Sequence, residues 1–171
     1  MQKWLNRDVY TRILTFVAIH FTTDPMLDSK KTTLAKSYPR LERNNKKLHL
    51  PLDHALADRL CLRFRLALEA AIQGRADLTT TQCLLEVTLL TSFVGEDGFS
   101  LIDEQITDDA ETALYQSLER ATNTRNIVLN AKTLENLTII VNEHDRQLRE
   151  LRLEVLLKAS ARLERLIQSG K

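Results

Sequence analysis

The histidines and cysteines are the residues with which this sequence could most readily bind a metal or activate a nucleophile. His49 and His54 flank a Leu-Pro-Leu-Asp stretch, and with Asp53 they could form a small metal site where the first core helix begins. Nothing in that stretch fixes the two imidazoles on one face, and Asp53 is already explained as the residue that caps the helix. The sequence therefore predicts no bound metal.

The other candidates for catalysis also have simpler structural explanations. His144 lies at a seam position of the last expected helix, where a polar residue more often sets the register of packed helices than binds a ligand. Cys61 and Cys83 sit in apolar runs, where a thiolate is disfavoured. Asp108 and Asp109 lie near a helix start, where the helix dipole favours acidic side chains. We predict no catalytic residues.

Cofactor-dependent chemistry is also unexpected. With only four glycines, the chain can form neither the dinucleotide-binding fingerprint nor the phosphate-binding loop of nucleotide hydrolases. We therefore expect a protein without a cofactor that is not an enzyme. An uncharacterised enzyme or metal-binding protein ranks last among the function classes.

Charge is distributed very unevenly along the chain, although 24 Lys and Arg nearly cancel 23 Asp and Glu. Residues 1–50 carry 10 basic and 4 acidic side chains, and residues 120–171 carry 10 basic and 6 acidic ones. Residues 76–119 carry 10 acidic side chains and no Lys or Arg. The near-neutral total therefore hides an acidic helical hairpin between two basic flanks, which produces strong local potentials.

The amino-terminal basic charge is concentrated in residues 26–51, a polar segment without helical periodicity that we interpret as an arm or linker. Its seven predicted binding residues are Lys30, Lys31, Lys36, Arg40, Arg43, Lys46 and Lys47. In one hypothesis the arm lies on the acidic hairpin of its own or a sister subunit. In a second it binds DNA or RNA, although Tyr38 is its only aromatic residue for base stacking. In a third, the acidic hairpin itself captures a basic partner or imitates a nucleic-acid backbone.

Composition favours an all-α protein. Gly and Pro supply only 4 and 3 residues and aromatic residues only 5%, whereas sheet proteins need frequent turns and many aromatic residues. The 43% of apolar residues is enough to build a core, and the length fits one domain. No apolar run approaches the ~18 residues of a membrane span. Two cysteines do not make a disulfide framework, so we expect a cytoplasmic protein without membrane contact.

The expected domain is a bundle of about four helices over residues 52–171, preceded by an apolar helix within residues 1–25 and by the arm. Its first helix begins after Asp53 and stops at Gly74.

The next two helices have their own expected caps. Thr79 and Gln82 can form a capping box, and that helix ends near Gly95. Ser100 and Asp103 offer a cap for the third helix, which is expected to run to about residue 122.

The last segment, residues 133–168, has an apolar stripe with alternating spacings of three and four, which shifts by one residue after Val155. One straight helix of this length would measure roughly 54 Å, longer than a compact domain of this size. Either the helix bends near the shift, or its end projects and needs a partner, for which a second copy is the default. The predicted seam between subunits consists of Leu137, Val141, His144, Leu148, Leu151 and Val155.

These patterns predict a small, non-enzymatic helical interaction or regulatory protein that self-associates. It would bind a macromolecular partner through its segregated basic and acidic surfaces. The alternative is a nucleic-acid-binding accessory protein that uses residues 30–47 of the arm.

Overall fold

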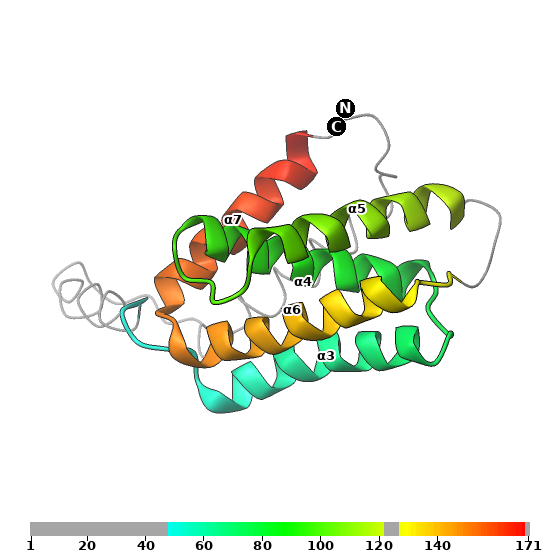
Figure 1. Ribbon diagram of the computed structural model, residues 1–171. Coiled ribbons are helices and arrows are strands. Elements are labelled where there is room, and N and C mark those ends of the chain that lie inside the picture. Colours follow the sequence, from blue (N-terminus) through cyan, green and yellow to red (C-terminus); the bar gives the residue numbers. More distant parts are fainter. Residues whose placement is uncertain (1–47, 122–126, 170–171) are drawn as a thin grey trace, which may run out of the picture.

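The computed structural model describes residues 48–121 and 127–169 (Figure 1). Its helices are α3 (His54–Ile72), α4 (Leu78–Glu96), α5 (Glu104–Arg120), α6 (Ala131–Glu150) and α7 (Leu153–Ser169). The described part of the chain contains no β-strand, which confirms the predicted all-α helical bundle. The apolar helix expected within residues 1–25 and most of the arm lie outside the described residues.

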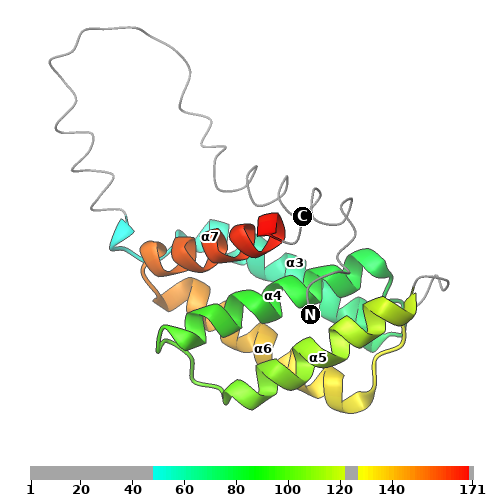
Figure 2. The same ribbon diagram turned by 90° about the horizontal axis from the view of Figure 1, so that it is seen from above.

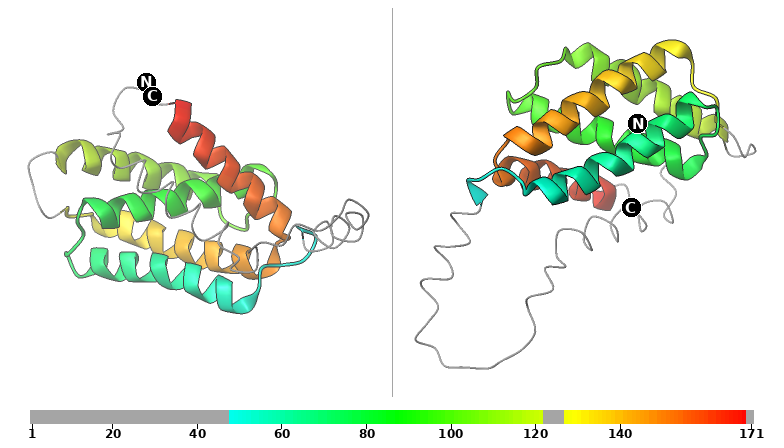
Figure 3. Two further views of the ribbon diagram at one scale, coloured as in Figure 1. Left: turned by 180° about the vertical axis from the view of Figure 1, so that it is seen from behind. Right: turned by 90° about the horizontal axis from the view of Figure 1, so that it is seen from below.

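Helix α4 is the central element of the bundle. Helices α3, α5, α6 and α7 all lie against it, and α6 also packs beside α3 and α5 (Figures 1 and 2). The sequence explains this position, because residues 81–94 are apolar or small at nearly every position and a helix that is apolar all round must be buried. Figure 3 shows α3 and α6 side by side, with α7 crossing the bundle on another face.

Side-chain caps set the helix starts, and one expected cap is wrong. Asp53 caps α3 as predicted, because its carboxylate accepts from the backbone N–H of Ala55 at 3.2 Å. In α4 the cap is Asp77 and not Thr79: the Asp77 carboxylate accepts from the backbone N–H and the hydroxyl of Thr80, both at 2.7 Å. The backbone of Asp77 is still extended, so the helix begins before Thr79 can act as its cap.

This correction makes a stability prediction. Asp77→Ala is expected to lower the free energy of unfolding by about 1 kcal/mol, because it removes the acceptor for the free N–H groups of the first turn. Thr79→Ala, two residues further on, is the matched control and should change stability by less than about 0.5 kcal/mol. Urea denaturation at pH 7 measures both, and a larger loss in the Thr79 variant would contradict the assignment.

Residues 133–168 form two helices, so of the two alternatives left open by the sequence the structure has the bend. Helix α6 ends at Glu150, and Leu151 is extended, with φ −83° and ψ 153°. The backbone there pairs instead with the segment before α3: Pro51 and Arg152 form an antiparallel bridge, and the N–H of Leu153 donates to the carbonyl of Leu50 at 2.9 Å. The bend lies at Leu151, before the shift in the apolar stripe.

The bend turns α7 back so that it packs against α4 and does not continue in the direction of α6 (Figure 1). The shifted stripe explains the direction of α7, since Ala159, Leu163 and Ile167 pack against Phe93 and Val94 at the carboxyl end of α4. None of the described helices is long and apolar enough to cross a membrane.

Candidate functional site

The predicted subunit seam lies within the bundle. Leu137, Val141, His144 and Leu148 are buried by the chain's own helices, and Leu151 and Val155 are half-buried at the junction of α6 and α7. Leu137 and Val141 belong to the main core together with residues of α3 and α4, and the His144 ring meets Phe64 of α3 edge-on. Self-association stays a prediction, but the four buried side chains could serve it only if the bundle opened.

The other predicted binding residues are separated or outside the described part. Lys30, Lys31, Lys36, Arg40, Arg43, Lys46 and Lys47 all precede residue 48, where the description begins. His49 is engaged with α7, with its Nδ1 3.2 Å from the carboxylate of Glu154, while Asp53 caps α3. Among the described residues, no three His, Cys, Asp or Glu side chains are grouped so as to hold a metal ion.

Neither cysteine is placed for nucleophilic chemistry. Both are buried and free. Burial raises the pKa of the Cys61 thiol and of the Cys83 thiol to about 12, and Cys61 donates a hydrogen bond to the Asp145 carboxylate at 2.9 Å. A thiol held in this way remains protonated near neutral pH, so it is a poor nucleophile.

The acidic residues of α4 are used within the fold. Glu86 is buried and accepts two hydrogen bonds from the guanidinium of Arg63 on α3, at 3.1 and 2.5 Å. At the carboxyl end of α4, Arg162 of α7 binds both oxygens of Glu96, at 2.6 and 2.9 Å, and Lys158 binds Asp97. Three acidic side chains thus orient α3 and α7 against α4.

The acidic residues along α5 are arranged differently. We call Glu104, Asp108, Asp109 and Glu111 the acidic face of α5. The first, second and fourth recur at helical spacing, and none of the four forms an ion pair with a described residue. Burial raises the pKa of the half-buried Glu111 carboxyl, and the negative charges of Asp108 and Glu96 raise it further. The acidic face therefore carries uncompensated negative charge.

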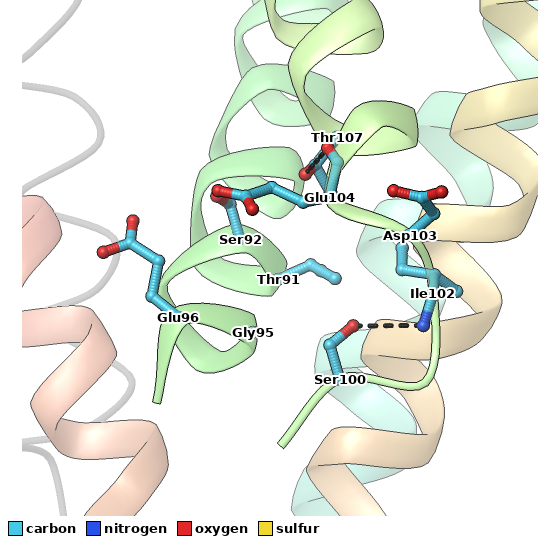
Figure 4. A pocket seen from close by; sticks show the side chains of 9 residues that line it. All are labelled: Thr91, Ser92, Gly95, Glu96, Ser100, Ile102, Asp103, Glu104 and Thr107. Carbon is cyan, nitrogen blue, oxygen red and sulfur yellow. Dashed lines mark hydrogen bonds between the residues drawn. The ribbon is translucent and has the colours of Figure 1, made fainter. Parts of the chain in front are cut away.

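A pocket of about 130 Å³ adjoins the acidic face where α4 ends and α5 begins (Figure 4). Seven of its nine lining residues carry a side-chain oxygen: the hydroxyls of Thr91, Ser92, Ser100 and Thr107 and the carboxylates of Glu96, Asp103 and Glu104. The other two are Gly95 and Ile102, so no cationic side chain from the described part of the chain lines the pocket. We call it the α4–α5 pocket.

Helix α6 and two glycines hold the loop that closes this pocket. The Glu143 carboxylate accepts from the backbone N–H of Leu101 at 3.0 Å, and Arg146 donates to the carbonyl of Phe99 at 2.9 Å. Gly98 has a positive φ of 85°, which favours glycine. At Gly95 the loop comes so close that an added Cβ would lie 3.2 Å from the Cβ of Ser100. The pocket wall is therefore fixed by α6 and by the turn.

The lining groups differ in how far the fold already uses them. Ser100 accepts from the N–H of Ile102 at 3.3 Å, and Asp103 caps α5. The Glu104 carboxylate has no hydrogen-bond partner among the described residues, and Figure 4 shows it extending from α5 toward Ser92. Thr91 is completely buried, and its hydroxyl also lacks a partner there. The exposed Glu104 carboxylate is available to a ligand, whereas the Thr91 hydroxyl is buried and without a partner among the described residues.

The sequence predicted the acidic hairpin, but not that its acidic residues near α4 are paired with cations while those of the acidic face are not. It treated the ten acidic residues as one surface, because the cations that neutralise Glu86, Glu96 and Asp97 come from α3 and α7, distant in sequence. The spacing of the acidic residues on α5 was the available signal for the exposed part. The α4–α5 pocket left no such signal, because its shape depends on the loop held by α6.

In comparisons with known proteins, no protein-family model, curated protein or solved structure matches this chain.

Proposed function

We propose that this protein is a small, non-enzymatic helical interaction protein whose acidic face on α5 binds a basic segment of a partner protein. The observation that supports the proposal is the uncompensated charge of that face. The fold supplies Arg63, Arg162 and Lys158 to the acidic residues of α4, but none of the described cations pairs with the acidic face. Complementary charge supplied by a partner would steer association.

The acidic face also carries an electrostatic cost within the free protein. Like charges one turn apart on a helix repel each other, as Glu104 and Asp108 do. Glu111 is half-buried beside Asp108, and these conditions raise the pKa of its carboxyl. Cationic side chains placed against the face would remove this repulsion. Because the repulsion is present in the free protein and removed by a bound cationic partner, its loss favours the bound state.

The second candidate function is nucleic-acid binding through the arm. The supporting observation is the set of seven basic residues between 30 and 47. An acidic face on the bundle repels a polyanion, so in this case the arm alone would supply the contact. The two functions require ligands of opposite charge, so titrations with one ligand of each charge distinguish them.

The test is a fluorescence-anisotropy titration of the full chain with a labelled decalysine peptide and, separately, with a labelled single-stranded oligonucleotide. We expect the peptide to bind, with an affinity that falls as salt rises. The double variant Asp108→Asn with Glu111→Gln should bind the peptide about five-fold more weakly, because two charge contacts are lost.

The matched control removes the same two charges elsewhere, by Glu135→Gln with Glu164→Gln on α6 and α7. This control should bind almost as well as the wild type. Equal weakening in both double variants would show that only net charge matters and would contradict the proposal. Tight binding of the oligonucleotide without binding of the peptide would favour the second candidate.

A further inference from the structure

We propose that the α4–α5 pocket holds the cationic end of one lysine or arginine side chain from the basic partner. This inference rests on the proposed function and names the contact that anchors the partner at one end of the acidic face. It assigns a binding role to Thr91 and Glu104.

The lining of the pocket suits a cation that donates hydrogen bonds. A lysine ammonium has three donors and no acceptor, and a guanidinium has five donors and no acceptor. The described lining residues offer hydroxyl and carboxylate oxygens and no cationic side chain. The end of α4 adds to this, because the carboxyl end of a helix carries partial negative charge and α4 has no basic residue in its last turn.

Thr91 provides an independent sign of a missing partner. Two other buried threonines of α4 donate to the carbonyl four residues earlier: Thr81 to Asp77 at 2.9 Å and Thr88 to Leu84 at 2.9 Å. Thr91 is completely buried, and its hydroxyl has no partner in the described part of the chain. Buried polar groups without a partner are rare in folded proteins. Thr91 is one of the residues that line the pocket, and Figure 4 shows its side chain leaving α4 on the side of the loop that carries Ile102.

The size and grouping of the pocket favour a side-chain end over other cations. A volume of about 130 Å³ is smaller than the ~300–1,000 Å³ of pockets that enclose whole organic ligands. A bare metal ion needs several ligands converging on one point. The described His, Cys, Asp and Glu side chains do not form such a group. An ammonium or guanidinium tolerates the wider spacing, because each donor can reach a different oxygen.

The experiment measures binding of the labelled decalysine peptide to full-length variants. Glu104→Gln should weaken binding about ten-fold, because it removes the charge of the unpartnered carboxylate at the pocket. Asp109→Asn is the matched control: it removes one charge from the same helix outside the pocket and should weaken binding only about two-fold.

Thr91→Val provides a second readout. It keeps the shape of the side chain but removes the hydroxyl, so we expect binding about three-fold weaker than wild type. The same variant should unfold at a higher urea concentration, because an unpartnered buried hydroxyl is removed. A purely structural role for Thr91 would move the unfolding midpoint and leave binding unchanged, which would overturn the role assigned to it.

The outcomes separate this inference from the proposed function. If the wild type fails to bind the peptide, both fail. If it binds and Glu104→Gln weakens binding no more than Asp109→Asn, the acidic face is retained and the pocket assignment is overturned. If 1,4-diaminobutane displaces the peptide at an equal concentration of amine, the ligand is a free amine, which overturns the assignment to a protein side chain.

Discussion

Arg63→Met is expected to lower the free energy of unfolding at pH 7 by about 3–5 kcal/mol, because it leaves the buried carboxylate of Glu86 without a counter-charge. The Glu86 side chain is only 2% exposed, and both of its oxygens accept from the Arg63 guanidinium. Methionine retains much of the volume of the arginine stem, so the loss is mainly electrostatic. Urea denaturation of the two proteins measures it.

The matched control is Arg162→Met on α7. Like Arg63, Arg162 binds both oxygens of a glutamate, Glu96, and each guanidinium lies over a phenylalanine ring: Arg63 is 5.2 Å from the centroid of Phe64, and Arg162 is 4.3 Å from that of Phe93. Glu96 is 42% exposed, so water solvates its charge when the arginine is removed. The expected loss is about 1 kcal/mol or less. Equal losses in the two variants would contradict the claim that burial of the carboxylate sets the cost.

The pH dependence of the Arg63 variant follows from the same burial. Burial raises the pKa of the Glu86 carboxyl, and the Arg63 charge opposes this effect in the wild type. In the variant, the folded form therefore takes up a proton at Glu86 at a higher pH than the unfolded form does. Stability of the variant relative to the wild type should recover as the pH falls toward ~4.3, the value for an unfolded glutamate.

As the pH falls from 7, the protein should lose stability first through His144, at pH values above those at which paired carboxylates such as Asp145 are protonated. His144 is buried, and burial lowers its pKa from 6.5 to about 4. Between these values the unfolded chain binds a proton that the folded chain excludes, so the free energy of unfolding falls as the pH falls. The full shift corresponds to about 3 kcal/mol. Urea denaturation at steps between pH 7 and pH 4 measures it.

His144→Leu isolates this contribution. Its packing cost is the same at every pH, so only the change with pH in the stability difference between the two proteins reports the histidine. The carboxyl of the neighbouring Asp145, hydrogen-bonded by Cys61, Arg65 and Arg149, has its pKa lowered to about 2 and acts at lower pH. A stability difference that stays constant between pH 7 and pH 4 would contradict this prediction, because it would show that His144 binds its proton equally well in the folded and the unfolded state.

Local signals predicted the helices well, because each depends on neighbouring residues. The cap at Asp53 and the turn at Gly74, whose φ is 67°, bound α3 nearly as expected. The cap of α4 was missed because Thr79 and Gln82 match a familiar pattern, whereas Asp77, two residues earlier, offers a stronger acceptor.

The bend at Leu151 depends on a distant part of the chain. Its backbone leaves the helix beside Pro51, which lies a hundred residues earlier, and periodicity along one segment carries no information about that pairing. The candidate site was likewise predictable only where it depends on residues close in sequence. The acidic residues of α5 follow a helical spacing, but the pocket beside them requires the loop that Glu143 and Arg146 hold.

The central position of α4 has a consequence for synthesis of the protein. Translation proceeds from the amino terminus, so α4 leaves the ribosome before α5, α6 and α7, three of the four helices that cover it. Until these follow, the apolar side chains of α4 have only α3 for cover, and exposed apolar surfaces are prone to aggregate. The nascent chain therefore passes through a stage in which its most hydrophobic helix is only partly covered.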